Sequence, residues 1–370
     1  MSVRVQLGSL VKLSTESAKD PVAAGLTRSV GLDHIDSDDL RLRRWSDIGN
    51  GADFTRVFRS GDVLFGKRRS YQRKVALADF DGVCSGDILV VRSADTRLDG
   101  LYLAYLLASP MFIGHAISSS AGSLSPRIRP RDLERFELDL PALDEQHRVV
   151  EVMRAVDREI EAAESVLNTT QCALAEFVRE TYLTPTNGAS PISLSSVVEV
   201  RDEVLRDQGA EEFDTKVGLE HLDTDDVILR RWDSGGAGDG FTRVFRAGDV
   251  LFGKLRAYLR KVVVTEFDGV CAGDLLVLRP MPEVLDALLL AYVLGNPMFI
   301  ESASRFTVGS ALPRVKAKDL LSLNCFLPPR VLGSADLVTL HKMHSVKMEA
   351  HNACAAGKGL RSALLQELIG

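Results

Sequence analysis

The sequence predicts a mixed α/β (α+β) fold, with two similar globular domains separated by two long antiparallel helices that form a coiled coil with pseudo-two-fold symmetry. Two observations support this prediction. The chain repeats itself at an offset of 187 residues, and each copy ends in a long segment with a heptad pattern. Since the chain has 370 residues, two copies account for nearly all of it.

The repeat is close and free of gaps in its best-matched part. Gly31–His34 returns as Gly218–His221, and residues 54–87 return as residues 241–274 with 25 identities in 34 positions. Each copy is long enough to bury its own core, unlike the repeat unit of a solenoid. We therefore expect two sibling domains, and their predicted ranges are 1–141 and 185–328.

Within each domain the pattern mixes strands and helices. Alternating apolar residues predict strands, which we interpret as a meander with a turn at Asp81-Gly82. Helical spacing over residues 101–107 predicts a helix that stops at Ser109-Pro110. The strands expected in the first copy are 5–7, 62–65, 74–78 and 88–92.

The segment 142–184 predicts a long central helix. Between Asp144 and Tyr182 there is no Gly or Pro, and apolar or small residues recur in alternating steps of four and three. This heptad seam is typical of a helix that packs against another helix. At 1.5 Å per residue, about 36 residues give a rod of roughly 54 Å. The seam positions are Val149, Met153, Val156, Ile160, Ala163, Leu167, Thr170, Leu174 and Phe177.

The segment 329–370 predicts the second long helix, with a rougher seam. Gly357 and Gly359 weaken it, each by about 1 kcal/mol relative to Ala. We expect the two helices to pair antiparallel, because a two-fold relation between the copies requires that direction. The predicted seam positions are Leu340, Met343, Ala350, Ala353, Gly357, Leu360 and Leu364.

The composition is that of an ordinary globular protein, with 45% hydrophobic and 26% charged residues. No apolar run approaches the roughly 18 residues of a membrane span, and the N-terminus lacks the apolar core of a signal peptide. We expect a cytoplasmic protein with no membrane partner. The five cysteines form no C-x-x-C pair, and Cys84 and Cys271 lie in strand-like runs, where cysteine behaves as a small buried hydrophobe.

The net charge of −6 conceals two basic segments. Residues 41–74 hold ten Lys or Arg against three Asp, and residues 228–261 hold eight against three. A basic segment on an acidic body is expected of a site that meets phosphates at a defined place. The alternative is a solvated face of alternating charges.

The sequence shows no catalytic constellation and no metal site. It has no G-x-x-x-x-G-K-[ST] phosphate loop, no H-E-x-x-H and no C-x-x-C. His34 and His221 recur without a Ser or Cys partner nearby, and His341 and His344 lack a third ligand. We therefore expect a binding protein with no catalytic residues, no metal ligands and no cofactor of its own.

The strongest candidate site is a basic loop that both copies keep, Gly66–Lys74 and Gly253–Lys261. Arg makes bidentate contacts to guanine or phosphate, Lys neutralises phosphate, and Tyr hydrogen-bonds or packs on sugar. A second pair of turns, Gly122–Arg127 and Gly309–Arg314, adds an arginine to each copy. The predicted DNA-binding residues are Lys67, Arg69, Tyr71, Arg73, Lys74 and Arg127 in the first copy, and Lys254, Arg256, Tyr258, Arg260, Lys261 and Arg314 in the second.

Several motifs, taken in order, resemble the specificity (S) subunits of type I restriction-modification systems. They are Gly61–Lys67, Lys74–Cys84, Pro126-Arg127 and Leu140–Gln146, the last leading into the heptad helix. The resemblance covers essentially the full chain in the order domain, helix, domain, helix. It implies two target-recognition domains and helices on which methyltransferase (modification) subunits dock, with a restriction/translocase subunit as a further partner. It also places S-adenosylmethionine, ATP and Mg on those partners.

From this resemblance we expect a non-catalytic subunit that binds double-stranded DNA. Because both domains carry the same basic loop, we expect a bipartite, near-palindromic target. The roughly 54 Å helix corresponds to about 16 base pairs at 3.4 Å each. One alternative is a non-catalytic protein scaffold whose basic loops bind acidic partners, and another is an enzyme with an unrecognised site.

Overall fold

The computed structural model describes residues 3–49, 54–122, 126–185, 190–205, 213–235, 240–306, 313–327 and 331–369. The chain divides into two compact units. Unit 1 is formed by residues 1–163 and 353–370, and unit 2 by residues 164–352. Each unit therefore combines one copy of the repeat with a part of each long helix.

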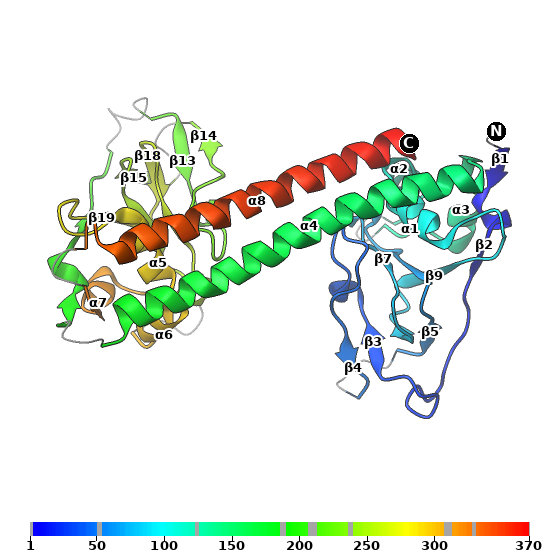
Figure 1. The fold of residues 1–370 in the computed structure, drawn as a ribbon, viewed down its shortest axis with the longest axis horizontal. Coiled ribbons are helices and arrows are strands. Elements are labelled where there is room, and N and C mark those ends of the chain that lie inside the picture. The colour runs from blue at the N-terminus through cyan, green and yellow to red at the C-terminus, as the bar shows by residue number, and fades with distance from the viewer. Residues whose placement is uncertain are drawn as a thin grey trace. The chain divides into compact units, whose positions relative to one another are not determined.

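Unit 1 is built on β-sheets (Figure 1). Its strands are β1 (Val3–Gln6), β2 (Val11–Leu13), β3 (Arg28–Val30), β4 (Ser46–Asp47), β5 (Arg56–Phe58), β6 (Val63–Gly66), β7 (Val75–Leu77), β8 (Gly82–Cys84), β9 (Ile88–Ser93) and β10 (Glu137–Leu140). One four-stranded sheet has the order β2-β9-β6-β7 and another the order β4-β3-β8-β5, while β1 pairs with β10. The mixed α/β class and the predicted strands are confirmed.

The hairpin of β6 and β7 frames the predicted basic loop, with Val63 opposite Leu77. The chain then leaves this sheet, because β8 pairs with β3 and β5, and it returns as β9 beside β6. The prediction of a simple meander is therefore wrong. Gly82 starts a strand in the other sheet, and a Cβ added there would lie 2.7 Å from both the Arg28 carbonyl oxygen and the Phe58 ring.

Short helices cover the strands of unit 1. They are α1 (Gly100–Ala108), α2 (Pro110–Ser118) and α3 (Pro130–Glu134). The predicted helix is confirmed as α1, and Asp99 caps it by accepting the N–H of Leu101 and of Tyr102. Pro110 ends α1 as predicted but also begins α2, whose Phe112 N–H donates to the Ser109 hydroxyl at 3.2 Å. A proline fits the first position of a helix as well as it fits a stop, so one signal serves both helices.

Unit 2 repeats this topology. Its strands are β11 (Ile192–Ser193), β12 (Val198–Arg201), β13 (Thr215–Val217), β14 (Asp233–Ser234), β15 (Phe241–Phe245), β16 (Val250–Gly253), β17 (Val262–Val264), β18 (Gly269–Ala272), β19 (Leu275–Pro280) and β20 (Asn324–Cys325). The sheet orders are β12-β19-β16-β17, β14-β13-β18-β15 and β11-β20, matching unit 1 strand for strand. The helices are α5 (Ala287–Gly295), α6 (Pro297–Ser304) and α7 (Ala317–Leu321). The repeat in sequence is thus also a repeat in structure.

The two predicted long helices are present. They are α4 (Leu143–Val178), which continues into a π-helix at Arg179–Leu183, and α8 (Ala335–Leu368). In unit 1 the beginning of α4 packs against the end of α8, since Met153 shares a core with Leu365 and Ile160 lies against Gly357 (Figure 1). This order of contacts shows that the helices run antiparallel there. In unit 2 the end of α4 and the beginning of α8 also share one core.

The buried face of α8 agrees with the predicted seam at Leu340 and Ala350 and departs from it further along the helix. Ala353 and Leu360, both predicted to face the partner helix, are exposed. The buried residues lie one position further along the chain, at Cys354 and Arg361, and Lys347 is buried seven residues before Cys354. A search for apolar residues misses these positions because two of the three carry charge.

Among the described residues, no single helix combines the length and the apolar character that a membrane span requires. Two bent pairs satisfy that test only when each is taken together, α1 with α2 at 60° and α5 with α6 at 63°.

Candidate nucleic-acid interface

The predicted basic loop has the same conformation in both units. Gly66–Lys74 connects β6 to β7, and Gly253–Lys261 connects β16 to β17. Each loop contains one short 3₁₀ helix, at Ser70–Gln72 and at Ala257–Leu259. The chemistry of the loop is therefore presented twice on the same local framework.

Two arginines in each loop have a left-handed backbone. Arg69 and Arg73 both have φ of 51°, and Arg256 and Arg260 both have φ of 49°. Residues other than glycine rarely adopt this conformation, which costs on the order of 1 kcal/mol or more at each position. Contacts with the rest of the unit must therefore hold the loop in place.

Backbone hydrogen bonds supply part of this support in unit 1. The Arg69 N–H donates to the Pro126 carbonyl at 2.9 Å, and the Ile128 N–H donates to the Lys67 carbonyl at 3.0 Å. These bonds bring Arg127 beside the loop. The two motifs that the sequence suggested separately thus form one surface in unit 1.

Unit 2 has the equivalent bonds. The Arg256 N–H donates to the Pro313 carbonyl at 3.1 Å, and the Val315 N–H donates to the Lys254 carbonyl at 3.0 Å. Arg314 therefore lies beside the second loop. Parts of the predicted glycine-led turns, residues 123–125 and 307–312, lie outside the described residues.

The glycine that opens each loop permits a close approach. A Cβ added at Gly66 would lie 3.0 Å from a Leu32 methyl group, and one added at Gly253 would lie 2.6 Å from a Leu219 methyl group. The last lysine of each loop uses this proximity. Lys74 Nζ donates to the Leu32 carbonyl at 2.6 Å. Its copy donates to the Leu219 carbonyl at 2.8 Å.

The second left-handed arginine of each loop also bonds within its own unit. Arg73 Nε donates to the Asp38 carboxylate, and its Nη2 donates to the Ala108 carbonyl at 3.3 Å. Arg260 Nε donates to the Asp225 carboxylate at 2.6 Å. A DNA contact by Arg73, Arg260 or the last lysine of either loop would require these internal bonds to break.

Two positions in each unit expose their cationic or aromatic side chains to solvent. Tyr71 is 56% exposed and its copy Tyr258 is 58% exposed. Arg69 and Arg256 are exposed, and no ion pair joins either to a carboxylate in the part of the chain that the structure describes. These four side chains are free to meet a ligand.

Lys67 and Lys254 are half-buried beside the exposed residues. Burial lowers the pKa of Lys67 below its usual range, and the nearby Arg56 guanidinium lowers it further. Burial and the Arg243 guanidinium lower the pKa of Lys254 in the same way. An approaching phosphate would relieve this repulsion, because an anion stabilises the charged lysine.

Arg127 and Arg314, which lie beside the two loops, each form a long ion pair with an aspartate. Arg127 lies 3.6 Å from the Asp87 carboxylate, and Arg314 lies 3.4 Å from that of Asp274. All four groups retain solvent access. Exposed ion pairs of this kind contribute about 0–1 kcal/mol, so a phosphate can compete with the carboxylate.

The sequence analysis missed the aspartate that holds each loop. Asp38 and Asp225 occupy equivalent positions, and both have a left-handed backbone, with φ of 56° and 61°. The repeat contained a usable signal, because an Asp-Asp pair recurs there at the 187-residue offset. The aspartates were not predicted because only residues that can contact phosphate, bases or sugar were taken as candidates.

A second missed feature is an exposed tryptophan in each unit. Trp45 packs edge-on against Phe80 with ring centroids 5.3 Å apart, and the Arg28 guanidinium lies 4.4 Å from the Trp45 ring centroid. Trp232 packs against Phe267 in the same way at 4.9 Å. The recurrence of Leu-Arg-Arg-Trp in the sequence was the available signal.

The cysteines follow the sequence prediction. Cys84 in β8 and Cys271 in β18 are buried, and burial raises the pKa of each thiol to about 12. In the described ranges, no group of three or more His, Cys, Asp or Glu side chains is placed to hold a metal ion.

The chain matches a known family over its first copy. A family model described as the type I restriction modification DNA specificity domain matches residues 37–168, which include the first basic loop, Arg127 and the beginning of α4. The type I restriction enzyme EcoDI specificity subunit of Escherichia coli is 30% identical over 118 residues. That alignment covers 32% of this chain and 25% of the relative, so it spans a quarter of the relative's length.

Two solved structures share the fold. A chain of a type I R-M system is 21% identical with a TM-score of 0.53, and the alignment covers 99% of this chain and 97% of that one. A type I restriction-modification system S subunit from M. genitalium is 13% identical with a TM-score of 0.57, and the alignment covers 100% and 96% of the two chains. The similarity in fold thus extends over the whole chain.

Proposed function

This chain belongs to the specificity subunits of type I restriction-modification systems, and we propose that it is the DNA-sequence-recognition subunit of such a complex. Each unit reads one half of a bipartite target through its basic loop. Because the two loops share their exposed residues, the half-sites are the same or nearly the same, and the target is near-palindromic.

One observation carries this proposal: the same Lys-Arg-Tyr group, with its Arg and Tyr exposed and its Lys half-buried, is held on the same left-handed turn in both units. The group consists of Lys67, Arg69 and Tyr71 in unit 1. A strained turn is kept only where the surrounding structure supports it, and such strain is concentrated at functional sites. Its retention in both copies favours a ligand that also has two related sites.

The residues divide into two roles. The exposed Arg69 and Tyr71 are suited to bases and sugar, and Lys67 with Arg127 is suited to phosphate. Arg73 and Lys74, predicted as contact residues, serve in this proposal to hold the loop against Asp38 and Leu32. The same division applies in unit 2.

The partners carry the chemistry in this proposal. Methyltransferase subunits dock on α4 and α8 and bring S-adenosylmethionine, and a restriction/translocase subunit brings ATP and Mg. The chain itself binds and positions DNA. Sequencing the methylated sites in a host that carries this chain and its methyltransferase tests the shared reader, since two unrelated half-sites would contradict it.

A salt titration of duplex DNA binding tests the loops directly. Each phosphate contact adds about 0.9 to the slope of log K against log salt, so Lys67→Ala with Lys254→Ala should lower the slope by about 2. The charge-matched control is Lys12→Ala with Lys342→Ala, two exposed lysines outside the loops. An unchanged slope in the loop variant would remove Lys67 and Lys254 from the interface. Binding to acidic proteins with no binding to DNA would favour the scaffold alternative.

A further inference from the structure

Two cations on α8 lie at positions where a helix pair normally buries apolar residues. Lys347 is 5% exposed and Arg361 is 6% exposed, and both lie on the line of heptad positions that includes Cys354. A buried charge is costly unless its environment compensates for it. The bonds that each cation makes therefore indicate what it is for.

In unit 1 the cation is Arg361. Its Nη1 donates to the carbonyl oxygen of Asp38, and its Nε lies 3.1 Å from the Asp157 carboxylate of α4. The Tyr105 hydroxyl of α1 also donates to Asp157, at 2.7 Å. Arg361 thus joins the helix pair to the turn at Asp38.

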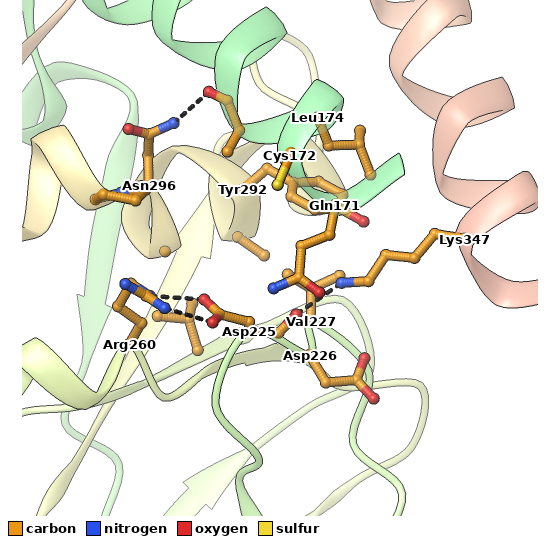
Figure 2. A pocket seen from close by; sticks show the side chains of 15 residues that line it. Gln171, Cys172, Leu174, Asp225, Asp226, Val227, Arg260, Tyr292, Asn296 and Lys347 are labelled. Carbon is orange, nitrogen blue, oxygen red and sulfur yellow. Dashed lines mark hydrogen bonds and ion pairs between the residues drawn. The ribbon is translucent and has the colours of Figure 1, made fainter. Parts of the chain in front are cut away.

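In unit 2 the cation is Lys347. Its Nζ donates to the carbonyl oxygen of Asp225 at 2.6 Å and lies 5.7 Å from the Tyr292 ring centroid. Figure 2 shows Lys347 reaching from its helix to Asp225, whose carboxylate points to Arg260. Lys347 thus joins the helix pair to the equivalent turn of the second unit.

The two acceptors are equivalent, but the two donors are not. Asp38 and Asp225 are separated by the 187-residue offset. At the same offset, Lys347 corresponds to Ile160 and Arg361 corresponds to Leu174. A cation therefore reaches the same carbonyl in both units from positions that the repeat does not relate, so duplication alone does not account for it.

The aspartate that receives the cation also holds the basic loop. Its carbonyl accepts from α8 while its carboxylate accepts from Arg73 in unit 1 and from Arg260 in unit 2. Arg73 and Arg260 have a left-handed backbone, and so do the two aspartates that they contact. Each unit thus has one continuous chain of polar contacts from α8 to the exposed loop.

We propose that Lys347 and Arg361 are positioning residues for DNA recognition, each fixing the aspartate turn that holds the basic loop of its own unit. This inference rests on the proposed function of the loops. The α8 cation stabilises the left-handed turn at Asp38 or Asp225, and the turn orients the arginine that closes the loop. Without the cation, the Lys-Arg-Tyr group of the loop samples several conformations and reads its half-site less selectively, because preorganisation is lost.

The competing role for a buried cation at a heptad position is to set the register of the helix pair. That role predicts a different result. Loss of the cation would then change the protection of α4 and α8 against hydrogen exchange but leave the loops unaffected.

The test uses the full chain and the variants Lys347→Met and Arg361→Met, which replace each cation by an unbranched apolar side chain. Hydrogen–deuterium exchange without DNA is measured for both loops. Lys347→Met should speed exchange about tenfold in residues 253–261 and leave residues 66–74 unchanged, and Arg361→Met should do the reverse. Lys347→Arg keeps the charge and should therefore keep the wild-type protection of residues 253–261. Lys342 is an exposed lysine on the same helix, and Lys342→Met should change exchange in neither loop.

Selection from a randomised duplex pool provides the second readout. Each variant should lose sequence information in one half-site, by about tenfold in the preference for the best sequence, and keep it in the other. Unchanged exchange in both loops, or loss confined to the helices, overturns the positioning role. If the wild-type chain selects no sequence at all, the proposed function fails, while the exchange experiment still decides whether the cations hold the loops.

Discussion

Units 1 and 2 have the same structure in the strands that carry the basic loop. They differ in the residues by which α8 contacts the aspartate turn behind that loop. Inside each unit, a buried aspartate accepts two bonds from one arginine, Asp62 from Arg92 and Asp249 from Arg279, with distances of 2.6–2.8 Å. At the contact with α8 the residue types differ, since unit 1 uses Arg361 and unit 2 uses Lys347. The strands that carry each loop, together with this buried Asp-Arg pair, form a loop frame that is the same in both units. The contact with the helices instead uses different residues to bring a cation to the aspartate turn.

The residue type at one position of the helix contact also differs between the units. In unit 2, Leu174 lines a cavity of about 210 Å³ together with Asp225, Tyr292 and Lys347 (Figure 2). Its counterpart at the 187-residue offset in unit 1 is Arg361, whose longer side chain is buried. The position that holds a leucine beside this cavity in unit 2 therefore holds a long cationic side chain in unit 1.

The largest effect on stability is expected from removing the buried Asp-Arg pair of the loop frame. Asp62→Asn in unit 1 and Asp249→Asn in unit 2 should each destabilise their own unit by about 3 kcal/mol, because the buried carboxylate loses a charge-assisted pair. Hydrogen exchange of β9 and β19 measures the two effects separately. Asp139→Asn, at an exposed position on β10, is the control and should have little effect. If one unit lost much less stability than the other, the frame would not be equivalent in the two copies.

The sequence predicted the frame better than the helix contact, for a physical reason. Alternation is a local signal and the duplication is visible when the chain is aligned with itself, so β6, β7, β9 and the basic loop could be predicted directly. The bonds from Arg361 to Asp38 and from Lys347 to Asp225 join residues far apart in the chain, and no spacing rule relates them. Charged residues at buried heptad positions also contradict the apolar pattern by which such positions are recognised.

The two glycines of α8 should give smaller effects on stability, with opposite signs. A Cβ added at Gly357 would lie 2.7 Å from Ile160 Cγ1, whereas one added at Gly359 meets no atom within 4 Å. Gly357→Ala should therefore destabilise unit 1 by about 1–2 kcal/mol through overpacking. Gly359→Ala should stabilise it by up to about 1 kcal/mol through helix propensity. Hydrogen exchange at the end of α8 measures both changes.

The background variant Ile160→Ala provides the control for the glycine pair. With the isoleucine side chain removed, Gly357→Ala should become stabilising, since only the gain in helix propensity remains. A Gly357→Ala variant that stayed destabilising in this background would show that the glycine is required for its backbone and not for the space it leaves.

The smallest effect concerns pH and unit 2 alone. Burial, with the nearby Lys347 and His341 charges, lowers the pKa of His344 to about 4, and its Nδ1 lies 2.9 Å from the Tyr292 hydroxyl. Between pH 6.5 and 4 the unfolded chain therefore binds a proton at this histidine that the folded chain does not. The linkage sign follows: His344 lowers the free energy of unfolding as pH falls through this window.

The size of the pH effect is limited by the partial exposure of the ring, so we expect a loss of about 1 kcal/mol on going from pH 7 to pH 5. His344→Gln keeps a polar side chain near Tyr292 and should remove this part of the pH dependence, measured as the difference from wild type in hydrogen exchange of α5. The carboxylates titrate equally in the wild type and the variant, so their contributions cancel in this difference. Unit 1 has Asp157 at the aligned position, so α1 should show no difference between the two proteins; equal differences in α1 and α5 would mean that the histidine acts on the whole chain and not on its own unit.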